Sequence, residues 1–552
     1  MDYNKLAELL FPDVTVTPEE LEAKYPARDL KEGARVTRFA PSPTGFLHIG
    51  GLFAAFVAKL TAVSTDGVFF LRIEDTDKKR EIEDGVSAIV NGLTEFGVDP
   101  MEGVMGMDKE EGSYGPYVQS KRADLYHCFA KKLVADGLAY PCFCSEDALT
   151  AQREKQEEAN VTKGYYGEWA VCRDLSFEEI EENIKAGKPY VLRLRSNGSL
   201  DKRITFDDMI KGKIEMPENN LDVVLLKTDG IPTYHFAHAV DDHLMRTTHV
   251  VRGDEWISSV PLHIQLFKSC GFKVPKYAHI APIMKEENGG KRKLSKRKDP
   301  EAAVSYYNSE GYPMESVTEY LLTIANSNFE EWRKANQNAP TSQFPFNLKK
   351  MSASGALFDL NKLTDISKNI ISVMTADAVL EKALAWAKEF DTELYNLLDA
   401  DKEYAKNIFS IDRGTAKPRK DIAKFSEVKN YVEYFYDDLF DFDPDLGERL
   451  TPEAAAEIIE AYLKVFDIAD DKDTWFAKVK ELCEPLGYTP NVKEYKKNPE
   501  SFKGHVGDVS SAIRLAITSR ANTPDLHAII QLLGEDKVKE RLNNALKIWR
   551  NN

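Results

Sequence analysis

The chain has 552 residues, 43% of them hydrophobic and 30% charged, which predicts a globular protein with several packed domains and excludes a mainly disordered one. No apolar run approaches the ~20 residues that cross a bilayer, and the acidic start MDYNKLAELLFPD differs from a secretory signal, so we expect a cytoplasmic protein with no membrane partner. Six scattered cysteines do not make a disulfide framework, and a formal net charge of −17 argues at first against a nucleic-acid partner.

Residues 1–34 predict a short helical extension. An apolar-rich run at residues 5–10 is followed by Thr17, Pro18 and Glu20 in a pattern typical of a helix start. The sequence assigns no function to this extension.

Residues 35–60 predict a strand, a loop and a helix. The strand, at 36–40, is β-branched or aromatic and is closed by two prolines, and apolar residues recur at helical spacing from His48 onward. The first turn of a helix has unpaired N–H groups that attract phosphate. Gly50 and Gly51 would let a phosphate or a base approach the backbone, and His48 offers a ring N–H.

The next buried strand is predicted at residues 68–73, which makes a βαβ unit. Glu74, Asp75 and Asp77 follow at its carboxyl end, where strands of parallel sheets face a ligand. We interpret Asp77 as the cap of a helix at 78–96, ended by a glycine.

The segment between residues 118 and 232 mixes helix and strand patterns, including an alternating strand at 190–195, and predicts an α+β domain. Cys142, Cys144 and Cys172 are candidate zinc ligands, since three thiolates need one more ligand for tetrahedral zinc. The fourth ligand stays open among Tyr166, Asp174 and His127, and ordinary buried cysteines are the alternative.

A strand predicted at residues 221–226 leads into GIPTYHFAHAVDD at 230–242. Arg252 then follows a β-like pair, and arginine suits two-pronged recognition of a carboxylate better than lysine does. We therefore take Arg38 and Arg252 as candidate carboxylate receptors, with ordinary surface ion pairs as the alternative.

Glycines followed by cations at residues 289–298, GGKRKLSKRK, predict a mobile loop that closes over polyphosphate. This cluster and a second one at 417–420 are basic patches on an acidic body, which fits selective RNA binding; solvated surface is the alternative. From about residue 364 the pattern is helical, as at 376–390 and 452–466, and 437–445 is an acidic connector.

Seven motifs occur in order between residues 35 and 363: RFAPSPTG, HIGG, RIEDTD, GPYVQS, PTYH, VVRGDEW and KLSKR. HIGG and KLSKR resemble the HIGH and KMSKS motifs of class I aminoacyl-tRNA synthetases, and RFAPSPTG resembles the bacterial-type glutamyl branch. KMSAS at 350–354 spells KMSKS more closely but lacks the second lysine, and we reject it.

The resemblance implies an α/β fold, with a Rossmann-type catalytic domain that carries an inserted α+β acceptor-end-binding domain, followed by all-α anticodon-binding domains. The expected ranges are 1–34 for the extension, 35–117 and 233–270 for the two catalytic halves, 118–232 for the insertion, 271–363 for a stem-contact region with the KMSKS-like loop, and 364–445 and 446–552 for two anticodon-binding domains.

The resemblance also implies the reaction: ATP-dependent activation of L-glutamate and its transfer to the 3′ ribose of tRNA(Glu), with ATP and Mg²⁺ as cofactors. Some relatives bind structural zinc with a fourth Tyr or His. The implied residues are His48, Lys293 and Lys296 for catalysis, His48, Gly50, Gly51, Glu255, Trp256 and Lys296 for ATP, and Arg38, Ala40, Ser42, Glu74, Tyr234, His238 and Arg252 for glutamate. The resemblance assigns no anticodon-reading residues in the helical half, where we suspect only Arg413, Lys417 and Arg419.

Two alternatives remain open at this stage. One is a shorter-type paralogue that glutamylates a modified tRNA base, which would lack the large helical half. The other is a non-catalytic RNA-binding member of the family, against which intact HIGG and KLSKR argue. We expect a monomer, and the sequence leaves open whether glutamine tRNA is also charged.

Overall fold

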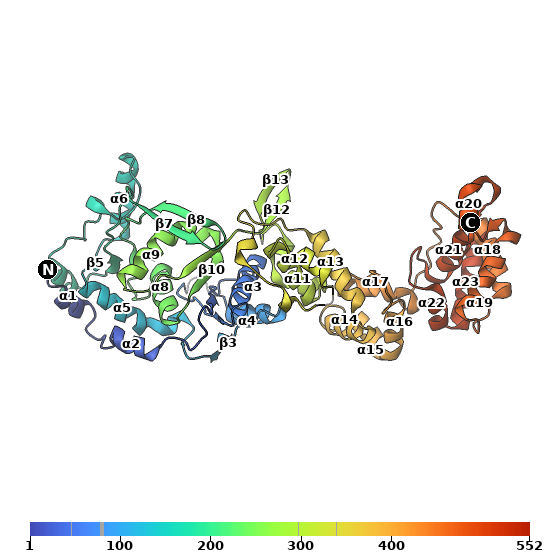
Figure 1. The fold of residues 1–552 in the computed structure, drawn as a ribbon, viewed down its shortest axis with the longest axis horizontal. Helices are drawn as coiled ribbons and strands as arrows, with labels where there is room; N and C mark the ends of the chain where they lie inside the picture. Colours follow the sequence, from blue (N-terminus) through green and yellow to red (C-terminus); the bar gives the residue numbers. More distant parts are fainter. Residues whose placement is uncertain (46, 78–81, 296, 338, 552) are drawn as a thin grey trace. The chain divides into compact units, whose positions relative to one another are not determined.

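The structure is a computed structural model that describes residues 1–45, 47–77, 82–295, 297–337 and 339–551 (Figure 1). Its contacts divide the chain into two compact units, Met1–Tyr306 with Thr318–Asp359, and Tyr307–Val317 with Leu360–Asn552. No helix in the described ranges is long and apolar enough to cross a membrane. The finer domain boundaries expected from the sequence stay predictions.

The first unit begins its sheet with the predicted strand, helix and strand: β1 (Val36–Phe39), α3 (Ile49–Val63) and β2 (Val68–Leu71). β1 and β2 are parallel, with Val36 opposite Val68, so the βαβ prediction is confirmed. β3 (Glu102–Gly106) extends the sheet in parallel and β4 (Lys109–Glu111) turns back against it. Because α3 follows β1 directly, the start of this helix lies at the carboxyl end of the sheet.

β10 (His249–Gly253) and β11 (Lys276–Ile280) are parallel and belong, with β7 (Arg203–Asp208) and β8 (Gly212–Pro217), to a second four-stranded sheet with the order β10-β11-β7-β8. The backbone N–H of Thr248, just before β10, donates to Val36 O at 3.0 Å, so β10 starts beside β1. The hairpin of β7 and β8 joins the far edge, where Asp208 pairs with Tyr277 of β11. α8 (Tyr234–Leu244) and α9 (Val260–Ser269) complete this part of the unit (Figure 1).

The predicted insertion contains a separate antiparallel sheet, β5 (Ala139–Cys142), β6 (Val191–Leu194) and β9 (Val224–Leu226), which confirms its α+β character. Its helices are α5 (Ala123–Ala135), α6 (Glu146–Glu158) and α7 (Phe177–Lys185). Before it, α1 (Tyr3–Leu10) and α2 (Pro18–Lys24) form the predicted extension, and Thr17 and Glu20 make the predicted capping box.

One helix prediction is wrong at its start. The helix expected over 78–96 is α4 (Gly85–Glu95), and residues 82–84, the described part of the interval before it, are not helical. Ile82 N–H donates to Pro43 O, and Asp84 adopts a left-handed backbone conformation with φ of 59°, so the chain turns here before the helix. Asp84, and not Asp77, occupies the N-cap position; residues 78–81 lie outside the described residues.

The rest of the first unit carries the hairpin β12 (Met284–Glu287) and β13 (Gly290–Lys293), with α11 (Met314–Ala325), most of which belongs here, and α12 (Phe329–Ala335). α10 (Val304–Glu310) runs from the first unit into the segment that belongs to the second.

The second unit is helical, as predicted, apart from the two-residue strands β14 (Tyr488–Thr489) and β15 (Gly504–His505). One hydrophobic core runs through it from Ile371 to Trp549. Its helices are α13 (Leu360–Val373), α14 (Ala376–Phe390), α15 (Thr392–Ala400), α16 (Lys402–Ser410), α17 (Val428–Val432), α18 (Pro452–Val465), α19 (Lys472–Glu481), α20 (Val492–Lys497), α21 (Val506–Thr518), α22 (Leu526–Leu533) and α23 (Glu535–Asn551).

Candidate active site

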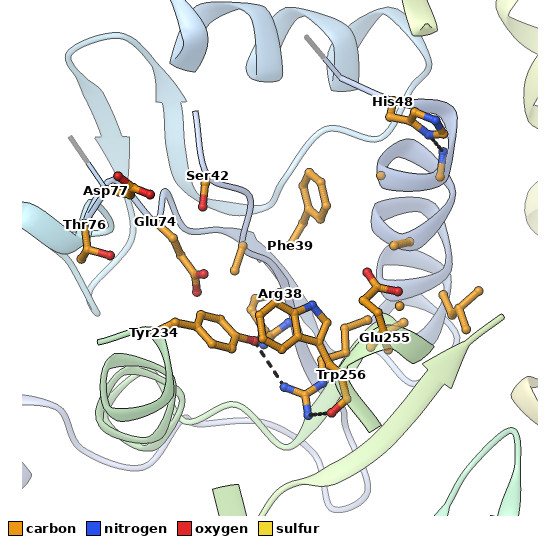
Figure 2. A pocket seen from close by; sticks show the side chains of 18 of the residues that line it. Arg38, Phe39, Ser42, His48, Glu74, Thr76, Asp77, Tyr234, Glu255 and Trp256 are labelled. Atoms are coloured by element: carbon orange, nitrogen blue, oxygen red, sulfur yellow. Dashed lines mark hydrogen bonds between the residues drawn. The ribbon is translucent and has the colours of Figure 1, made fainter. Parts of the chain in front are cut away.

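A cavity of about 1140 Å³ opens at the carboxyl end of the parallel sheet, between the tip of α3, the segment after β2, the start of α8 and the segments after β10 and β11. Figure 2 shows the labelled side chains that line it. Twelve of the predicted ligand-binding residues line this cavity, although they come from segments more than 200 positions apart: Arg38, Ala40, Ser42, His48, Gly50, Gly51, Glu74, Tyr234, Arg252, Glu255, Trp256 and Lys293.

His48 is the N-cap residue of α3, and its Nδ1 accepts the backbone N–H of Gly50 at 2.9 Å (Figure 2). Because Nδ1 is the acceptor, the ring proton of the neutral imidazole is on Nε2, which makes that atom a donor. The sequence predicts that the Gly50 N–H binds phosphate, but in the structure this N–H donates to the His48 imidazole. Gly50 and Gly51 still line the cavity, where the absence of side chains leaves room for a ligand.

Asp242 anchors the side chain of Arg38. Nε of Arg38 lies 3.2 Å from both carboxylate oxygens, and Nη1 of Arg72 donates to the same carboxylate at 2.7 Å. The side chain of Arg38 is 4% exposed and those of Arg72 and Asp242 are fully buried. The two arginines lower the pKa of Asp242 well below its usual value, although burial alone would raise it. The VDD motif thus supplies the counter-charge that keeps Arg38 in place.

Glu74 is a buried carboxylate at the cavity wall. Its Oε1 accepts from Nη2 of Arg72 at 3.1 Å, and burial raises its pKa above the usual value against the pull of Arg72 and Arg38. In Figure 2 its carboxylate points into the cavity toward Tyr234. A buried carboxylate in this position suits an ammonium group, because the incoming positive charge compensates the cost of burial.

Arg252 and Tyr234, which both line the cavity, contact each other. Nη1 of Arg252 donates to the Tyr234 hydroxyl at 3.3 Å, and the Tyr234 ring packs on Trp256 with a centroid distance of 4.3 Å. Since the tyrosine oxygen accepts from arginine, its own O–H can donate to a ligand. Glu255 is exposed at the cavity rim.

The structure does not bring His238 to the cavity. It is fully buried under Tyr234, with the two rings stacked at 6.0 Å, and its Nδ1 lies 2.9 Å from the carboxylate of Asp242. Burial lowers its pKa to about 4, so the ring is neutral at pH 7. We therefore place His238 beneath the site rather than in contact with a ligand.

The KLSKR segment begins at Lys293, the last residue of β13, and described residues at or next to its two ends have internal partners. Leu294 is buried and its N–H donates to Ile283 O, while Arg292 donates to Asp299 at 2.6 and 2.8 Å. Lys293, between these anchors, is exposed and lines the cavity. The predicted catalytic residue Lys296 lies outside the described residues. In the rejected KMSAS segment, Lys350 ends a short 3₁₀ turn and is absent from the lining of this cavity.

Sequence reasoning missed further cavity residues, among them Thr76, Lys227 and Asp229. Nζ of Lys227 donates to Thr76 O at 2.9 Å and joins the segment after β2 to the turn that follows β9. Lys227 belongs to no recognisable motif, although its position shortly before PTYH at 232–235 could have drawn attention to it.

The three predicted zinc-binding cysteines converge in the insertion, with all three sulfurs within 4.8 Å of one another. Tetrahedral zinc with Zn–S bonds of ~2.3 Å places sulfurs about 3.8 Å apart, and Sγ of Cys144 lies 3.6 Å from Sγ of Cys172. The hydroxyl of Tyr165 lies 3.4 Å from both Cys142 and Cys144. The donor set therefore fits zinc.

None of the three predicted candidates for the fourth zinc ligand is at this cluster. The Tyr166 hydroxyl donates to Thr162 O, Asp174 accepts from Arg195, and His127 contacts Gly230 O. Tyr165 replaces them, one position from the predicted tyrosine.

Two of the three suspected anticodon residues, Arg413 and Arg419, have internal partners in the second unit. Arg413 donates to the carbonyl oxygens of Ile371, Met374 and Phe409, and Arg419 pairs with Asp421 and contacts Asn522. The structure thus gives Arg413 a role in closing helix ends, and its part in anticodon reading stays a prediction, as do those of Lys417 and Arg419.

Comparisons with known proteins agree with this picture. Residues 35–365 match the family model for the catalytic domain of class I tRNA synthetases (E and Q), and residues 493–546 match an anticodon-binding domain. The chain is 52% identical to the glutamate–tRNA ligase of Clostridium perfringens, over 99% of this chain and 100% of that protein, and 49% identical to that of Acetivibrio thermocellus, again over 99% and 100%. A crystal structure of a glutamate tRNA ligase from Elizabethkingia meningosepticum, in complex with its amino acid, aligns with a TM-score of 0.76 at 28% identity over 93% of this chain and 99% of that chain.

Proposed function

The chain belongs to the class I tRNA synthetases of the glutamate and glutamine family, and from this premise we infer that it ligates glutamate to tRNA(Glu) and that the cavity of Figure 2 is where glutamate and ATP react. The observation that carries this inference is the meeting, in one cavity, of groups suited to each part of the two substrates. Relatives that match over their full length include the helical half, which disfavours the shorter paralogue.

Glutamate carries two carboxylates and one ammonium group, and the cavity offers one partner for each. Arg38 and Arg252 are the receptors for the two carboxylates, because guanidinium groups form strong charge-assisted hydrogen bonds with them. Glu74 receives the ammonium group. Tyr234 packs beside the aliphatic part, and Ala40 and Ser42 form the wall after β1.

ATP occupies the side of the cavity between α3 and the KLSKR segment. Nε2 of His48 donates to phosphate, Gly50 and Gly51 leave room for the nucleotide, and Glu255 and Trp256 line the rim. Lys293 and Lys296 supply positive charge. Mg²⁺ binds through substrate phosphates and one or two carboxylates, and Asp77, Asp229 and Glu255 line this cavity, so the donor set fits magnesium that enters with ATP.

The reaction needs no nucleophile from the protein. An oxygen of the glutamate α-carboxylate attacks the α-phosphorus of ATP and pyrophosphate leaves; a hydroxyl of the terminal ribose of the tRNA then attacks the glutamyl carbonyl and AMP leaves. The enzyme contributes by placing the reactants and by stabilising the charge that develops on the phosphates. His48 and the lysines are positioned for the second task.

Zinc is a structural component in this proposal. Cys142, Cys144, Cys172 and Tyr165 would hold the ion at the end of β5, within the insertion. Bound zinc would tie the segment between α6 and α7, which carries Tyr165 and Cys172, to the end of β5.

The test is aminoacylation with the purified full-length chain and separate tRNA(Glu) and tRNA(Gln) transcripts. We expect glutamate-dependent charging of tRNA(Glu), and a second measurement with tRNA(Gln) defines the tRNA range. Binding of tRNA(Glu) without any charging would contradict the proposal and favour a non-catalytic RNA-binding protein.

A further inference from the structure

Two buried histidines lie behind Arg252. Nε of Arg252 donates to Nε2 of His279 at 3.1 Å, and its Nη2 lies 3.1 Å from Nδ1 of His263. Both histidines are fully buried. Because a guanidinium group has only donors and keeps its charge at any working pH, both contacted ring nitrogens have to be acceptors and hence unprotonated.

The tautomer of His279 is set by Asp208. With Nε2 as acceptor, the ring proton of His279 is on Nδ1, and this atom lies 2.7 Å from Oδ2 of Asp208. The carboxylate also accepts the backbone N–H groups of His279, Ile210 and Lys211. Burial would raise the pKa of Asp208, but these hydrogen bonds, led by the one from His279, lower it, so the group is a carboxylate.

A second set of contacts fixes His263. Because Nδ1 of His263 is an acceptor, the ring proton of His263 is on Nε2. This Nε2 lies 2.9 Å from Nδ1 of His235 and donates to it. His238 packs on His263 with ring centroids 4.5 Å apart. Burial lowers the pKa values of His263 and His279, and the nearby charge of Arg252 lowers them further, which keeps both rings neutral.

We propose that Asp208, His279 and His263 are positioning residues that hold Arg252 in the one orientation in which it can read a substrate carboxylate. The two histidines occupy the Nε and Nη2 side of the guanidinium, which a carboxylate would otherwise approach with two parallel hydrogen bonds. The ligand carboxylate instead meets Nη1 of Arg252 together with the O–H of Tyr234. This inference rests on the proposed function, since it takes Arg252 as a receptor for glutamate.

The hydrogen bond between Asp208 and His279 joins two strands of different origin. Asp208 is the last residue of β7, in the hairpin at the sheet edge, and His279 belongs to β11. The hairpin comes from the predicted insertion, and it supplies the carboxylate on which the orientation of Arg252 depends. No sequence motif joins these three positions, which lie 71 residues (Asp208 to His279) and 27 residues (Arg252 to His279) apart.

The first test compares two His279 variants of the full-length chain by glutamate-dependent, tRNA-supported pyrophosphate exchange. His279→Phe removes the acceptor, and a lost hydrogen bond to a charged group predicts a glutamate KM that is roughly 10–100-fold higher, with an ATP KM within about twofold of the wild type. His279→Gln can place its amide oxygen near Arg252 and recovers most of the loss. His249→Gln, on the same strand as Arg252 without a contact to it, is the matched control and leaves both KM values unchanged.

The second test separates tautomer control from simple packing. Asp208→Asn presents an amide N–H to Nδ1 of His279, so the ring proton moves to Nε2. Nε2 then faces the Nε–H of Arg252 as a second donor, and the hydrogen bond between them is lost. The substitution should raise the glutamate KM as much as His279→Phe does, and it should add little in the His279→Gln background, where no ring tautomer exists. Circular dichroism melts establish that each variant is folded.

The outcomes are distinguishable. If the wild-type chain activates glutamate and folded His279→Phe keeps the wild-type glutamate KM, the positioning role is wrong while the proposed function stands. Equal rises in the glutamate and ATP KM values, or additive effects of Asp208→Asn and His279→Gln, also overturn it, because they indicate general damage. If the wild-type chain shows no glutamate-dependent exchange, both the proposed function and this inference fall.

Discussion

Asp242 holds Arg38 from behind: Nε of the arginine lies 3.2 Å from each of the two carboxylate oxygens. The two residues are 204 positions apart and come from β1 and α8, each of which lies at the start of one of the two expected catalytic halves. Arg38 is therefore braced on one side and lines the cavity on the other. Asp208 and His279 do the same for Arg252 through an imidazole, so each predicted carboxylate receptor is held by a buried acid, directly or through one ring.

Arg38→Lys keeps the positive charge but loses the planar fork. We expect the glutamate KM to rise by about 10–100-fold, because the lost charge-assisted hydrogen bond contributes ~1.5–3 kcal/mol, while the ATP KM changes little. Pyrophosphate exchange at varied glutamate provides both constants. Arg203→Lys, at an exposed arginine paired with Glu215, is the control; an unchanged glutamate KM in folded Arg38→Lys would count against the assignment.

His48 has two tasks, and His48→Asn separates them. The side-chain oxygen of asparagine can still cap α3 at the Gly50 N–H, since asparagine is among the best N-cap residues, but the Nε2 donor is lost. We expect the exchange rate to fall by ~10²–10³, the typical effect of losing one donor to the transition state, with the melting temperature unchanged. His48→Ala should show the same rate and lower stability, by about 1 kcal/mol. A wild-type rate in His48→Asn refutes the phosphate contact.

The two lysine motifs make opposite predictions. Lys296→Ala, in KLSKR, should lower the exchange rate by ~10²–10³ and leave the glutamate KM nearly unchanged, because the lysine acts on the phosphates and not on the amino acid. Lys350→Ala, in KMSAS, should be neutral, as Lys350 does not line the cavity. The reverse pattern would show that the wrong lysine segment had been chosen.

Zinc content is measurable without any activity assay. Purified wild-type chain should contain about one zinc per chain, and Cys142→Ser should contain none, since a single lost thiolate breaks a closed tetrahedral site. Tyr165→Phe should bind zinc more weakly, as seen by competition with a chromophoric chelator, whereas Tyr166→Phe should not, because Tyr166 bonds elsewhere. Metal-free wild-type protein rules out the site.

The buried histidines predict how acid affects the first unit. Burial lowers the pKa of His238 and of His249 to about 4, whereas an unfolded histidine titrates near 6.5. The unfolded chain thus binds protons that the folded chain refuses, so the stabilisation is complete above about pH 6.5 and is lost as the pH falls toward 4. Between pH 7 and pH 5 the fully buried His238 lowers the free energy of unfolding by about 2 kcal/mol, and His249, whose charge is partly screened by solvent, lowers it by less.

Hydrogen exchange of β10 and β11 checks this acid effect, because His249 lies on β10 and His238 packs beside Tyr277 of β11. Once intrinsic exchange rates are corrected for pH, protection should be lower at pH 5 than at pH 7. In His249→Gln the loss of protection between pH 7 and pH 5 should be smaller, because the contribution of His249 to the acid effect is absent. Equal protection at both pH values would show that these rings are already protonated or exposed in the folded protein.

The local elements could be predicted from the sequence because their signals are local. A buried strand closed by prolines and a helical repeat after His48 define β1 and α3, and the order of the motifs locates the cavity. The start of α4 could not be predicted, because it depends on a hydrogen bond from Ile82 to Pro43, which precedes it by 39 positions.

The errors within the sites have a similar cause. Tyr234 and His238 are four residues apart on a helix and therefore share a face, so the sequence pattern predicts that both line the pocket. In the structure Tyr234 lies between the pocket and His238. The zinc loop has no periodicity that distinguishes Tyr165 from Tyr166. Asp208, His263 and His279 carry no motif, so only the fold reveals that they surround Arg252.

Pyrophosphate exchange in the presence of tRNA(Glu), with wild-type protein and with His48→Asn, tests the central claim most directly. If the tip of α3 and the KLSKR segment act on one ATP beside bound glutamate, wild-type exchange depends on glutamate, aspartate does not replace it, and His48→Asn reduces the rate by ~10²–10³. Absence of glutamate-dependent exchange in folded, tRNA-bound wild-type protein would contradict the account.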